Sequence, residues 1–446
     1  MLRSAALAIA LALAAALGAC AGEPERSVRA MPRPDERGAL LVEKSPAAPV
    51  ASYRIAAAYD EEKHRIVATQ TLTWVNTGGA PVTALPFHLY MNAFKNDSSV
   101  FMQESGGRHR GARAAEGGWG WIDVTKVSVD GGDDLGARLE WPGPDETVMR
   151  VPLDKAVPPG GRAEVAMSFE VQLPVVFART GYLGHFTMAG QWFPKVGVLV
   201  GDAWHCEPFH LHSEFFADFG SYEVALTVPD TLVVAATGVL TGAVDDPGPT
   251  RTLTYRAEAV HDFAWMADPF METIRAVART DAGEVEVVVY FREPQRAFAE
   301  RHLATGVRAI EVLSRLLGAY PWSRMSIVDP PTDAVHGAGG MEYPTLVTTG
   351  GDTVVAPEGV RIPEYVTIHE VAHNWFQGML ASNEVDEAWL DEGLNEYVDA
   401  LVMHELYGRD ESSFDLWGMV GDILETRSWG AMFGEDPDPA TQPSYR

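Results

Sequence analysis

The strongest constraint on this chain is a pair of histidines four positions apart with a glutamate beside the first. Residues 369–373 read HEVAH, and Glu392 follows after eighteen spacer residues. On an α-helix, positions i and i+4 lie on one face, so His369 and His373 can both reach one metal ion at about 2.0–2.1 Å. The segment therefore predicts a helix that holds a zinc ion.

The acidic residues near the histidines predict a catalytic site. A second helix is expected from about residue 387 to residue 407, because the segment opens with acids and stops before Gly408. Glu392 on that helix would complete a His/His/Glu set and leave the fourth position to water, which is the ligand count of a catalytic zinc. Glu370, turned about 100° from the histidines, can address that water as a general base. The alternative is an ordinary amphipathic helix that carries two histidines.

Three segments together resemble a known family. HEVAHNWF and WLDEGLNEY are similar to the H-E-x-x-H-x18-E and W-L-x-E-G-x-x-x-Y segments of the membrane alanyl aminopeptidase family of gluzincins, peptidase family M1, and GGMEYP resembles its G-x-M-E-N exopeptidase motif. The spacing before the third ligand fits this family better than the thermolysin family, which has one residue more. The resemblance covers most of residues 51–446. It implies a zinc-dependent aminopeptidase with one zinc per chain and peptides with a free N-terminus as substrates.

The resemblance also assigns a substrate-binding role to the GGMEYP segment. It implies that Gly339, Gly340, Met341 and Glu342 bind the substrate, with the Glu342 carboxylate holding the terminal ammonium so that only the first peptide bond meets the zinc. Tyr343 replaces the usual Asn of the family, which affects the shape of the first side-chain pocket. The structural alternative for Glu342 is an unrelated ion pair on a strand.

Two further residues are candidates for supporting the chemistry. Glu396 lies four residues beyond Glu392 on the same helix face and could accept a hydrogen bond from the free ring nitrogen of a ligand histidine; the alternative is a solvated acid. Tyr445, in the terminal QPSYR, best matches a family tyrosine that donates to the oxyanion of the reaction. The resemblance implies that the rest of the catalytic domain and a helical domain are absent from these 446 residues, as in a fragment or a short form.

The pattern of apolar, polar and turn-forming residues along the chain predicts two folded domains. Alternating segments such as RIVATQTLTWVN and YEVALTVP, separated by Gly, Pro and Asp, predict an N-terminal all-β sandwich over residues 51–270. The pattern over residues 271–446 is mixed, with strands at 285–291 and 324–331, a helix at 297–320 and an edge strand in GGMEYPTLVTT. This order matches the α+β, thermolysin-like zinc metallopeptidase domain that the resemblance implies.

The N-terminus predicts export. Residues 1–19 contain Arg3, an apolar run and small residues before Cys20, which is the layout of a signal peptide and too short for a comfortable membrane span. LGAC resembles a bacterial lipobox, which implies lipidation of Cys20; a plain secretory signal is the alternative. Residues 20–50 are predicted to form a disordered tether. We therefore expect an exported, membrane-anchored lipoprotein on the periplasmic or extracellular side.

The remaining features bound the function. An excess of 62 acidic over 34 basic residues argues against nucleic acid and anionic membrane surfaces as electrostatic partners. The segment HCEPFHLH, residues 205–212, could bind a second metal, but structural packing is the favoured interpretation. Lipidation of Cys20 would leave Cys206 without a disulfide partner. Gln191 is a weak candidate for a substrate contact. A catalytically impaired zinc-containing binding module and an endopeptidase remain alternatives to the aminopeptidase.

Overall fold

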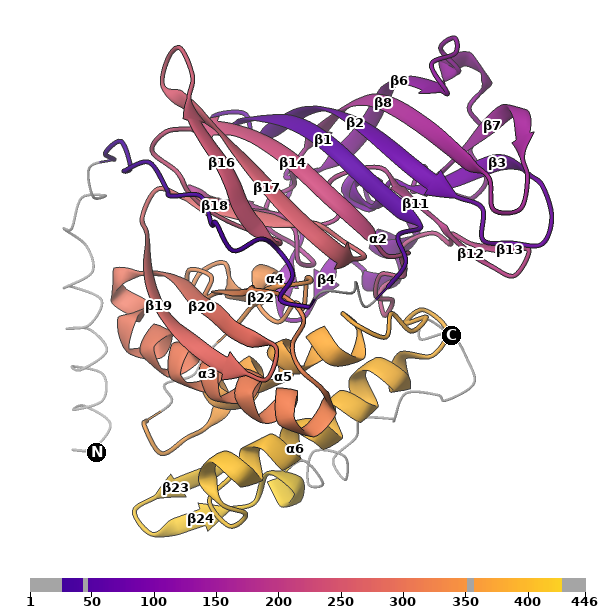
Figure 1. The fold of residues 1–446 in the computed structure, drawn as a ribbon. Helices are drawn as coiled ribbons and strands as arrows, with labels where there is room; N and C mark the ends of the chain where they lie inside the picture. The colour runs from indigo at the N-terminus through magenta and orange to yellow at the C-terminus, as the bar shows by residue number, and fades with distance from the viewer. Residues whose placement is uncertain (1–25, 43–46, 351–356, 427–446) are drawn as a thin grey trace.

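The computed structural model describes residues 26–42, 47–350 and 357–426. A large N-terminal β-sandwich lies above a smaller mixed α/β part in Figure 1. The predicted fold class is therefore confirmed. The predicted signal peptide, Cys20 and Tyr445 lie outside the described residues. Within the described ranges, no helix is both long enough and apolar enough to cross a membrane.

The main N-terminal sheet has seven strands in the order β16-β17-β14-β1-β2-β8-β6. Its side chains alternate between buried and exposed along β1 and β14, which is the period-two pattern of a sheet with one face on the core. Its strands are β1 (Ala51–Asp60), β2 (Arg65–Val75), β6 (Trp121–Val129), β8 (Arg162–Gln172), β14 (Gly220–Pro229), β16 (Val239–Asp245) and β17 (Thr250–Val260).

Smaller sheets cover the inner face of this sheet. Tyr59 of β1 places its hydroxyl 2.6 Å from that of Thr187 and packs edge-on against Trp265, so β10 and β18 close the core from the opposite side. The strands of these sheets are β3 (Val82–His88), β7 (Val148–Val157), β9 (Gly181–Leu183), β10 (Phe186–Ala189), β11 (Lys195–Val196), β12 (Val198–Val200), β13 (Ala203–His205), β15 (Val233–Ala236) and β18 (Trp265–Asp268). The short elements η1 (Tyr90–Phe94), α2 (Val100–Ser105), β4 (Arg108–His109), β5 (Ala112–Arg113) and η2 (Gly136–Arg138) lie in the connections.

The second part is built on a four-stranded sheet and three main helices. Its strands are β19 (Met271–Thr280), β20 (Gly283–Arg292), β21 (Arg324–Val328) and β22 (Leu346–Thr348), in that order across the sheet. Residues 287–291 of β20 are all buried, and α3 packs against this strand. The other elements are η3 (Glu293–Gln295), α3 (Arg296–Leu317), α4 (Val335–Ala338), α5 (Ile362–Phe376), η5 (Trp389–Gly393), α6 (Leu394–Tyr407), β23 (Phe414–Leu416) and β24 (Met419–Gly421). The expected strand–helix–strand order at 285–331 is that of β20, α3 and β21.

The predicted tether requires a correction. Residues 26–42 do not hang free but run across both parts of the molecule, as Figure 1 shows. The Asp35 amide donates to the Leu240 carbonyl at 2.7 Å, and the Leu41 amide donates to the Pro321 carbonyl at 2.8 Å. Backbone pairing of this kind needs no apolar periodicity, so a polar, proline-rich composition did not reveal it.

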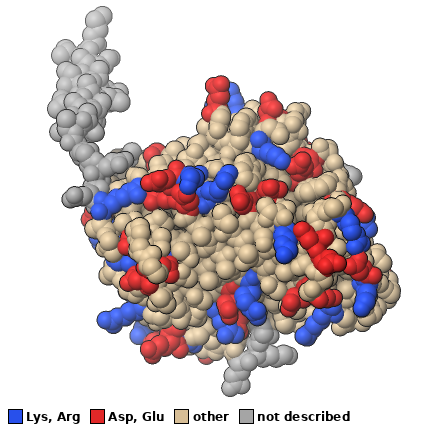
Figure 2. All heavy atoms as spheres, turned by 90° about the horizontal axis from the view of Figure 1, so that it is seen from above, with Lys and Arg blue, Asp and Glu red and all other residues tan. Residues whose placement is uncertain are grey.

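The surface charge is spread over the molecule. On the face seen in Figure 2, acidic and basic side chains are interspersed around a broad area that carries neither. The net charge of −28 is therefore not gathered into one acidic block on that face.

Candidate metal centre

Helix α5 is held at both ends by contacts to α3 and the residues after it. Pro363 lies in its first turn, where a missing N–H costs no hydrogen bond. Glu364 in the same turn accepts two hydrogen bonds of 2.7 Å from Arg301 of α3. At the other end, the Trp375 indole donates to the Gly318 carbonyl at 2.8 Å. These contacts fix the helix that carries the two histidines.

The three predicted zinc ligands surround one point. Nε2 of His369 lies 3.1 Å from Nε2 of His373 and 3.3 Å from a carboxylate oxygen of Glu392. Nε2 of His373 lies 3.7 Å from the same oxygen. Donor atoms of a tetrahedral zinc, each about 2.0–2.1 Å from the metal, are about 3.3–3.4 Å apart. The donor set therefore has the composition and the spacing that zinc requires.

The helix expected over residues 387–407 is present, but its first turn is irregular. The chain is helical without a break from Ala388 to Tyr407, with the π-helical turn η5 leading directly into α6. Glu392 lies in η5. Such π-helical turns are rare in proteins as a whole, but those that occur are often found at functional sites. The apolar spacing of a sequence does not reveal one extra residue in a turn, so this irregularity was not predicted.

Two buried aspartates orient the ligand histidines. Nδ1 of His369 lies 2.8 Å from Asp399, and Nδ1 of His373 lies 2.7 Å from Asp391. Such partners fix the tautomer, so that Nε2 faces the metal. The assignment of this role to Glu396 is thus corrected. Asp399 is seven residues beyond Glu392, which is two helical turns along the same face, and it lies among buried apolar residues. An aspartate at such a core-facing position is the feature of the sequence that could have identified it.

The charges of the site favour a bound cation. Burial opposes protonation of both rings, but the carboxylates of Asp399 and Asp391 outweigh it and raise the pKa of His369 and His373 well above the usual range. Burial also opposes ionisation of Glu392, yet its hydrogen bond to His369 lowers the pKa of Glu392 well below the usual range. One oxygen each of Asp391 and Asp399 has no hydrogen-bond partner among the described residues. A divalent ion would compensate this concentration of negative charge.

Glu370 lies beside the ligands with a free oxygen. It is buried, and its Oε2 has no hydrogen-bond partner within the described ranges. Burial raises the pKa of its carboxyl. A Cβ added to Gly340 would lie 3.6 Å from the other Glu370 oxygen, and one added to Gly339 would lie only 2.7 Å from the Thr349 carbonyl. The two glycines of GGMEYP therefore let this segment pass close to Glu370 and to its own neighbouring strand.

The segment after these glycines folds back on itself. The Thr348 amide donates to the Met341 carbonyl at 2.8 Å, which closes a tight loop before β22 at the end of its sheet. Asn374, next to His373, accepts a 3.0 Å hydrogen bond from the Thr345 amide and ties this loop to α5. Tyr343 is buried against Gly190, where an added Cβ would lie 2.0 Å from the Tyr343 hydroxyl. Tyr343 thus forms part of the wall behind the loop.

Glu342 is one of three carboxylates that gather near the zinc ligands, and its charge acts directly on His373 and Glu370. Oxygens of Glu214, Glu342 and Glu384 lie within 4.8 Å of one another. Burial raises the pKa of Glu342 to about 8. Arg179 forms an ion pair with Glu214. An oxygen of Glu384, which is 2% exposed, has no hydrogen-bond partner in the described part of the chain. This acidic cluster was missed because its members are up to 170 residues apart in sequence.

The other two candidates from the sequence, the HCEPFHLH segment and Gln191, make hydrogen bonds to neighbouring protein side chains. Among the described residues, the only groups of donors close enough for a metal are the zinc ligands and the acidic cluster, so the HCEPFHLH segment shows no second metal site. His210 bonds to Glu104 at 2.8 Å. Gln191 is buried and accepts a 2.6 Å hydrogen bond from Lys195, so its amide is held within the N-terminal sandwich.

Comparison with known proteins agrees with this geometry. Residues 301–432 match the Peptidase family M1 domain. Leucine aminopeptidase 2 from Sclerotinia sclerotiorum is 26% identical over 130 residues, which are 28% of this chain and 20% of that protein. Aminopeptidase B from Rattus norvegicus is 29% identical over 161 residues, which are 33% of this chain and 22% of that protein. The matches thus span about a fifth of each relative.

A solved structure extends the likeness of fold to nearly the whole chain. It is an M1 zinc metallopeptidase from Deinococcus radiodurans bound to a Tyr-Ser-Ala substrate, with a TM-score of 0.55 and 17% identity over 90% of this chain and 76% of that one. The fold and the donor set define the class of zinc metallopeptidases that hold their ion with two histidines of one helix and a glutamate of the next. Within this class, the part of the chain over residues 301–432 matches the domain of peptidase family M1.

Proposed function

We propose that the protein is a zinc-dependent aminopeptidase that hydrolyses the N-terminal peptide bond of peptides. The observation that carries the proposal is the acidic cluster of Glu214, Glu342 and Glu384 beside the zinc ligands. A cluster of carboxylates can bind the positively charged ammonium of a free N-terminus. Because the ammonium is held there, only the first peptide bond of the substrate reaches the zinc position. One zinc per chain is proposed, on His369, His373 and Glu392.

In this mechanism the protein positions the groups and moves a proton. A zinc ion, when bound, supplies Lewis-acid chemistry to the scissile carbonyl and to the attacking water. Asp399 and Asp391 hold the ligand rings with Nε2 toward the ion. Glu370 accepts the proton of the water and delivers it to the leaving amine; its free, buried oxygen supports this role. The oxyanion role of Tyr445 stays a prediction, because this residue lies outside the described ranges.

The acidic cluster would hold the substrate amine. Burial raises the pKa of Glu342 to about 8 and the pKa of Glu384 well above its usual range, so a bound cation that favours the charged form would stabilise both carboxylates. Arg179 is already paired with Glu214, so the other two carboxylates remain for the ammonium. The Deinococcus radiodurans enzyme binds a peptide, Tyr-Ser-Ala, which supports peptides as the substrate class.

The proposal is tested by comparing free and blocked substrates. Aminoacyl anilides and short peptides are assayed with a free and an acetylated amine, together with zinc analysis of the wild type and of His373→Ala. A charge-assisted contact of roughly 1.5–3 kcal/mol predicts that acetylation lowers kcat/KM by about ten- to 150-fold or more. In the Glu342→Ala variant, the difference in kcat/KM between free and acetylated substrates should be smaller. Equal cleavage of acetylated peptides would make the enzyme an endopeptidase. Zinc without hydrolysis would favour the binding module.

We also propose that the protein is exported and anchored by a lipid on Cys20. LGAC at positions 17–20 supports this proposal. Arg26 is only six positions beyond Cys20, and a fully extended chain of six steps spans at most about 20–22 Å, so the folded protein would lie close to its membrane. Mass spectrometry of the mature N-terminus tests the proposal. If Cys20 is unmodified, the proposal of a lipid anchor is wrong and only export of the protein remains.

A further inference from the structure

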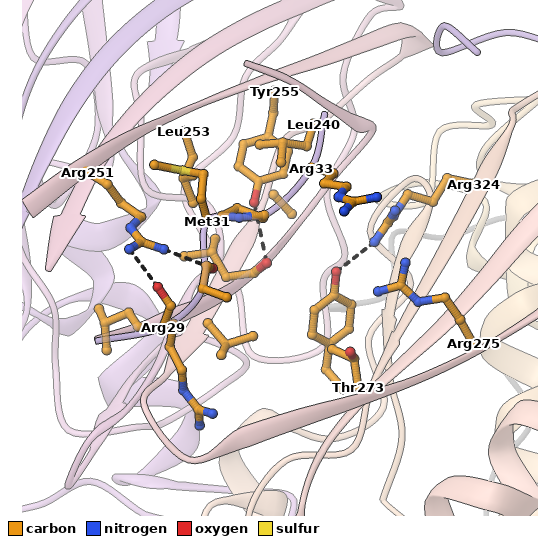
Figure 3. Close-up of a pocket in the computed structure, with 17 residues that line it drawn as sticks. Arg29, Met31, Arg33, Leu240, Arg251, Leu253, Tyr255, Thr273, Arg275 and Arg324 are labelled. Carbon is orange, nitrogen blue, oxygen red and sulfur yellow. Dashed lines mark hydrogen bonds between the residues drawn. The ribbon is translucent and has the colours of Figure 1, made fainter. Parts of the chain in front are cut away.

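A pocket lies away from the zinc ligands, where the two parts of the molecule meet. It has a volume of about 440 Å³, within the range of small-molecule sites. The segment 29–33 crosses it, and β15, β16 and β17 face β19, β20 and the start of β21 across it (Figure 3). The residues that line it are Arg29, Ala30, Met31, Pro32, Arg33, Leu232, Val233, Val234, Ala236, Leu240, Arg251, Leu253, Tyr255, Thr273, Arg275, Tyr290 and Arg324.

The lining is cationic in a strongly acidic protein. It contains five arginines and no Asp or Glu, although the chain has a net charge of −28. The ion-pair partners of these arginines are three carboxylates outside the lining, on Asp245, Glu272 and Glu286. Arg33 has no ion pair among the described residues. At least two positive charges are therefore left without a counter-charge.

Three of the guanidinium groups converge. In Figure 3, the side chains of Arg33, Arg275 and Arg324 lie on one side of the pocket and approach one another. Arg324 is held in place because it donates to Glu286 and to the Tyr290 hydroxyl, both at 2.8 Å. Arg275 is 63% exposed and shares Glu286 at 3.6 Å, so its guanidinium keeps donors for a ligand. Such an arrangement suits a planar or tetrahedral oxyanion.

The rest of the pocket is apolar and largely preformed. Leu240 of β16, Leu253 of β17 and Val234 of β15 are buried wall residues. Arg251 of β17 donates hydrogen bonds to the carbonyls of Arg29 and Ala30, at 2.8 and 3.2 Å, and so ties the segment 29–33 to the wall of the pocket. The Nε atom of Arg251, a residue only 3% exposed, has no hydrogen-bond partner in the described ranges. The pocket thus offers an apolar compartment next to a cationic one.

We propose that this pocket binds a small amphiphilic anion, with a carboxylate or phosphate head on Arg33, Arg275 and Arg324 and an apolar body against Leu240 and Leu253. The site is independent of the zinc centre, because none of its residues belongs to the ligand set or to the acidic cluster. Guanidinium groups bind both head groups in the same bidentate way, so the two are distinguished by experiment.

The test is titration calorimetry of the metal-loaded protein with decanoate, decyl phosphate and decanol, below the concentrations at which they form micelles. The two anions should bind with one site per chain, decanol should bind at least about tenfold more weakly, and the tighter anion identifies the head group. Affinity should rise along hexanoate, octanoate and decanoate by up to about fourfold per methylene, as apolar burial requires.

Two arginine variants locate the site. Arg33→Glu and Arg275→Ala should each weaken decanoate binding by about tenfold or more. Arg162→Glu on β8, five strands away from β16 in the main sheet, makes the same charge change as Arg33→Glu and should leave binding unchanged. Unchanged melting temperatures and peptidase activity would show that the variants are folded. No saturable binding of either anion, equal binding of decanol, or equal affinity in Arg33→Glu would overturn the proposal.

Discussion

Asp399 places a carboxylate oxygen 2.8 Å from Nδ1 of His369, on the opposite side of the ring from Glu392, whose oxygen lies 3.3 Å from Nε2. The imidazole is therefore held between a buried acid and the metal position. The same arrangement recurs at His373, with Asp391 at 2.7 Å. This pairing means that the metal affinity of the site depends on residues that are not ligands.

The first prediction concerns that dependence. Asp399→Asn should lower zinc affinity by about 10- to 100-fold, because the ring of His369 loses a charged partner that fixes its orientation and basicity. Glu396→Gln, on the same helix, is the matched control and should keep wild-type affinity, because Asp399 and Asp391 are the partners at Nδ1 of the two ligand rings. Competition with a chelator measures both. A larger effect of Glu396→Gln would restore the role that the sequence assigned to Glu396.

The second prediction separates the base from the ligands. Glu370→Gln should retain one zinc per chain and lower kcat by at least about 10²-fold, because the proton acceptor is removed while His369 and His373 stay in place. Elemental analysis and steady-state kinetics on the same preparation provide the measurement. Near-normal turnover would mean that another residue is the base.

The third prediction addresses the acidic cluster. Glu384→Gln should raise KM for peptides with a free amine by about ten- to 150-fold, because a buried carboxylate next to the ammonium is neutralised. The effect should be much smaller on acetylated peptides. Glu387→Gln, an exposed acid three residues further along the chain, is the control. Equal effects of Glu384→Gln on free and acetylated peptides would show that Glu384 supports the fold and does not hold the amine.

The fourth prediction is a pH dependence of stability. Burial raises the pKa of Asp218 from 3.8 to about 6, and its Oδ2 has no hydrogen-bond partner in the described part of the chain. Because the folded-state pKa is the higher one, the native state gains from protonation below about pH 4 and loses this stability as the pH rises through about 6. Asp218→Asn should therefore stabilise the protein at pH 8 by about 1–2 kcal/mol, allowing for partial exposure, and by little at pH 4.

Urea unfolding of metal-free protein at pH 4, 6 and 8 measures this dependence without interference from zinc loss. Asp123→Asn, at an exposed position of β6, provides the control for the change of side chain. An equal gain of Asp218→Asn at all three pH values would contradict the assigned cause.

The shared face of His369 and His373 and the fold class could be predicted from the sequence for one physical reason. The spacing of four residues and the alternation of strands are local periodicities, and a helix or a sheet converts them directly into common faces. His369 and His373 therefore point to one place in any helix that contains them. The strand–helix–strand order before the site is similarly local, and β20, α3 and β21 follow it.

The tertiary structure alone decided which distant residues complete these local patterns. Asp391, which lies within the π-helical turn η5, is 2.7 Å from Nδ1 of His373, the kind of contact that the sequence had suggested for Glu396. Glu214 joins Glu342 from another domain, and Arg33 joins Arg324 across almost 300 residues of sequence. Such contacts depend on how sheets and helices pack, and no short-range period records them. The sequence by itself thus determined which side chains to expect around one metal position, while packing determined the charges around them and the cationic pocket between the two parts of the molecule.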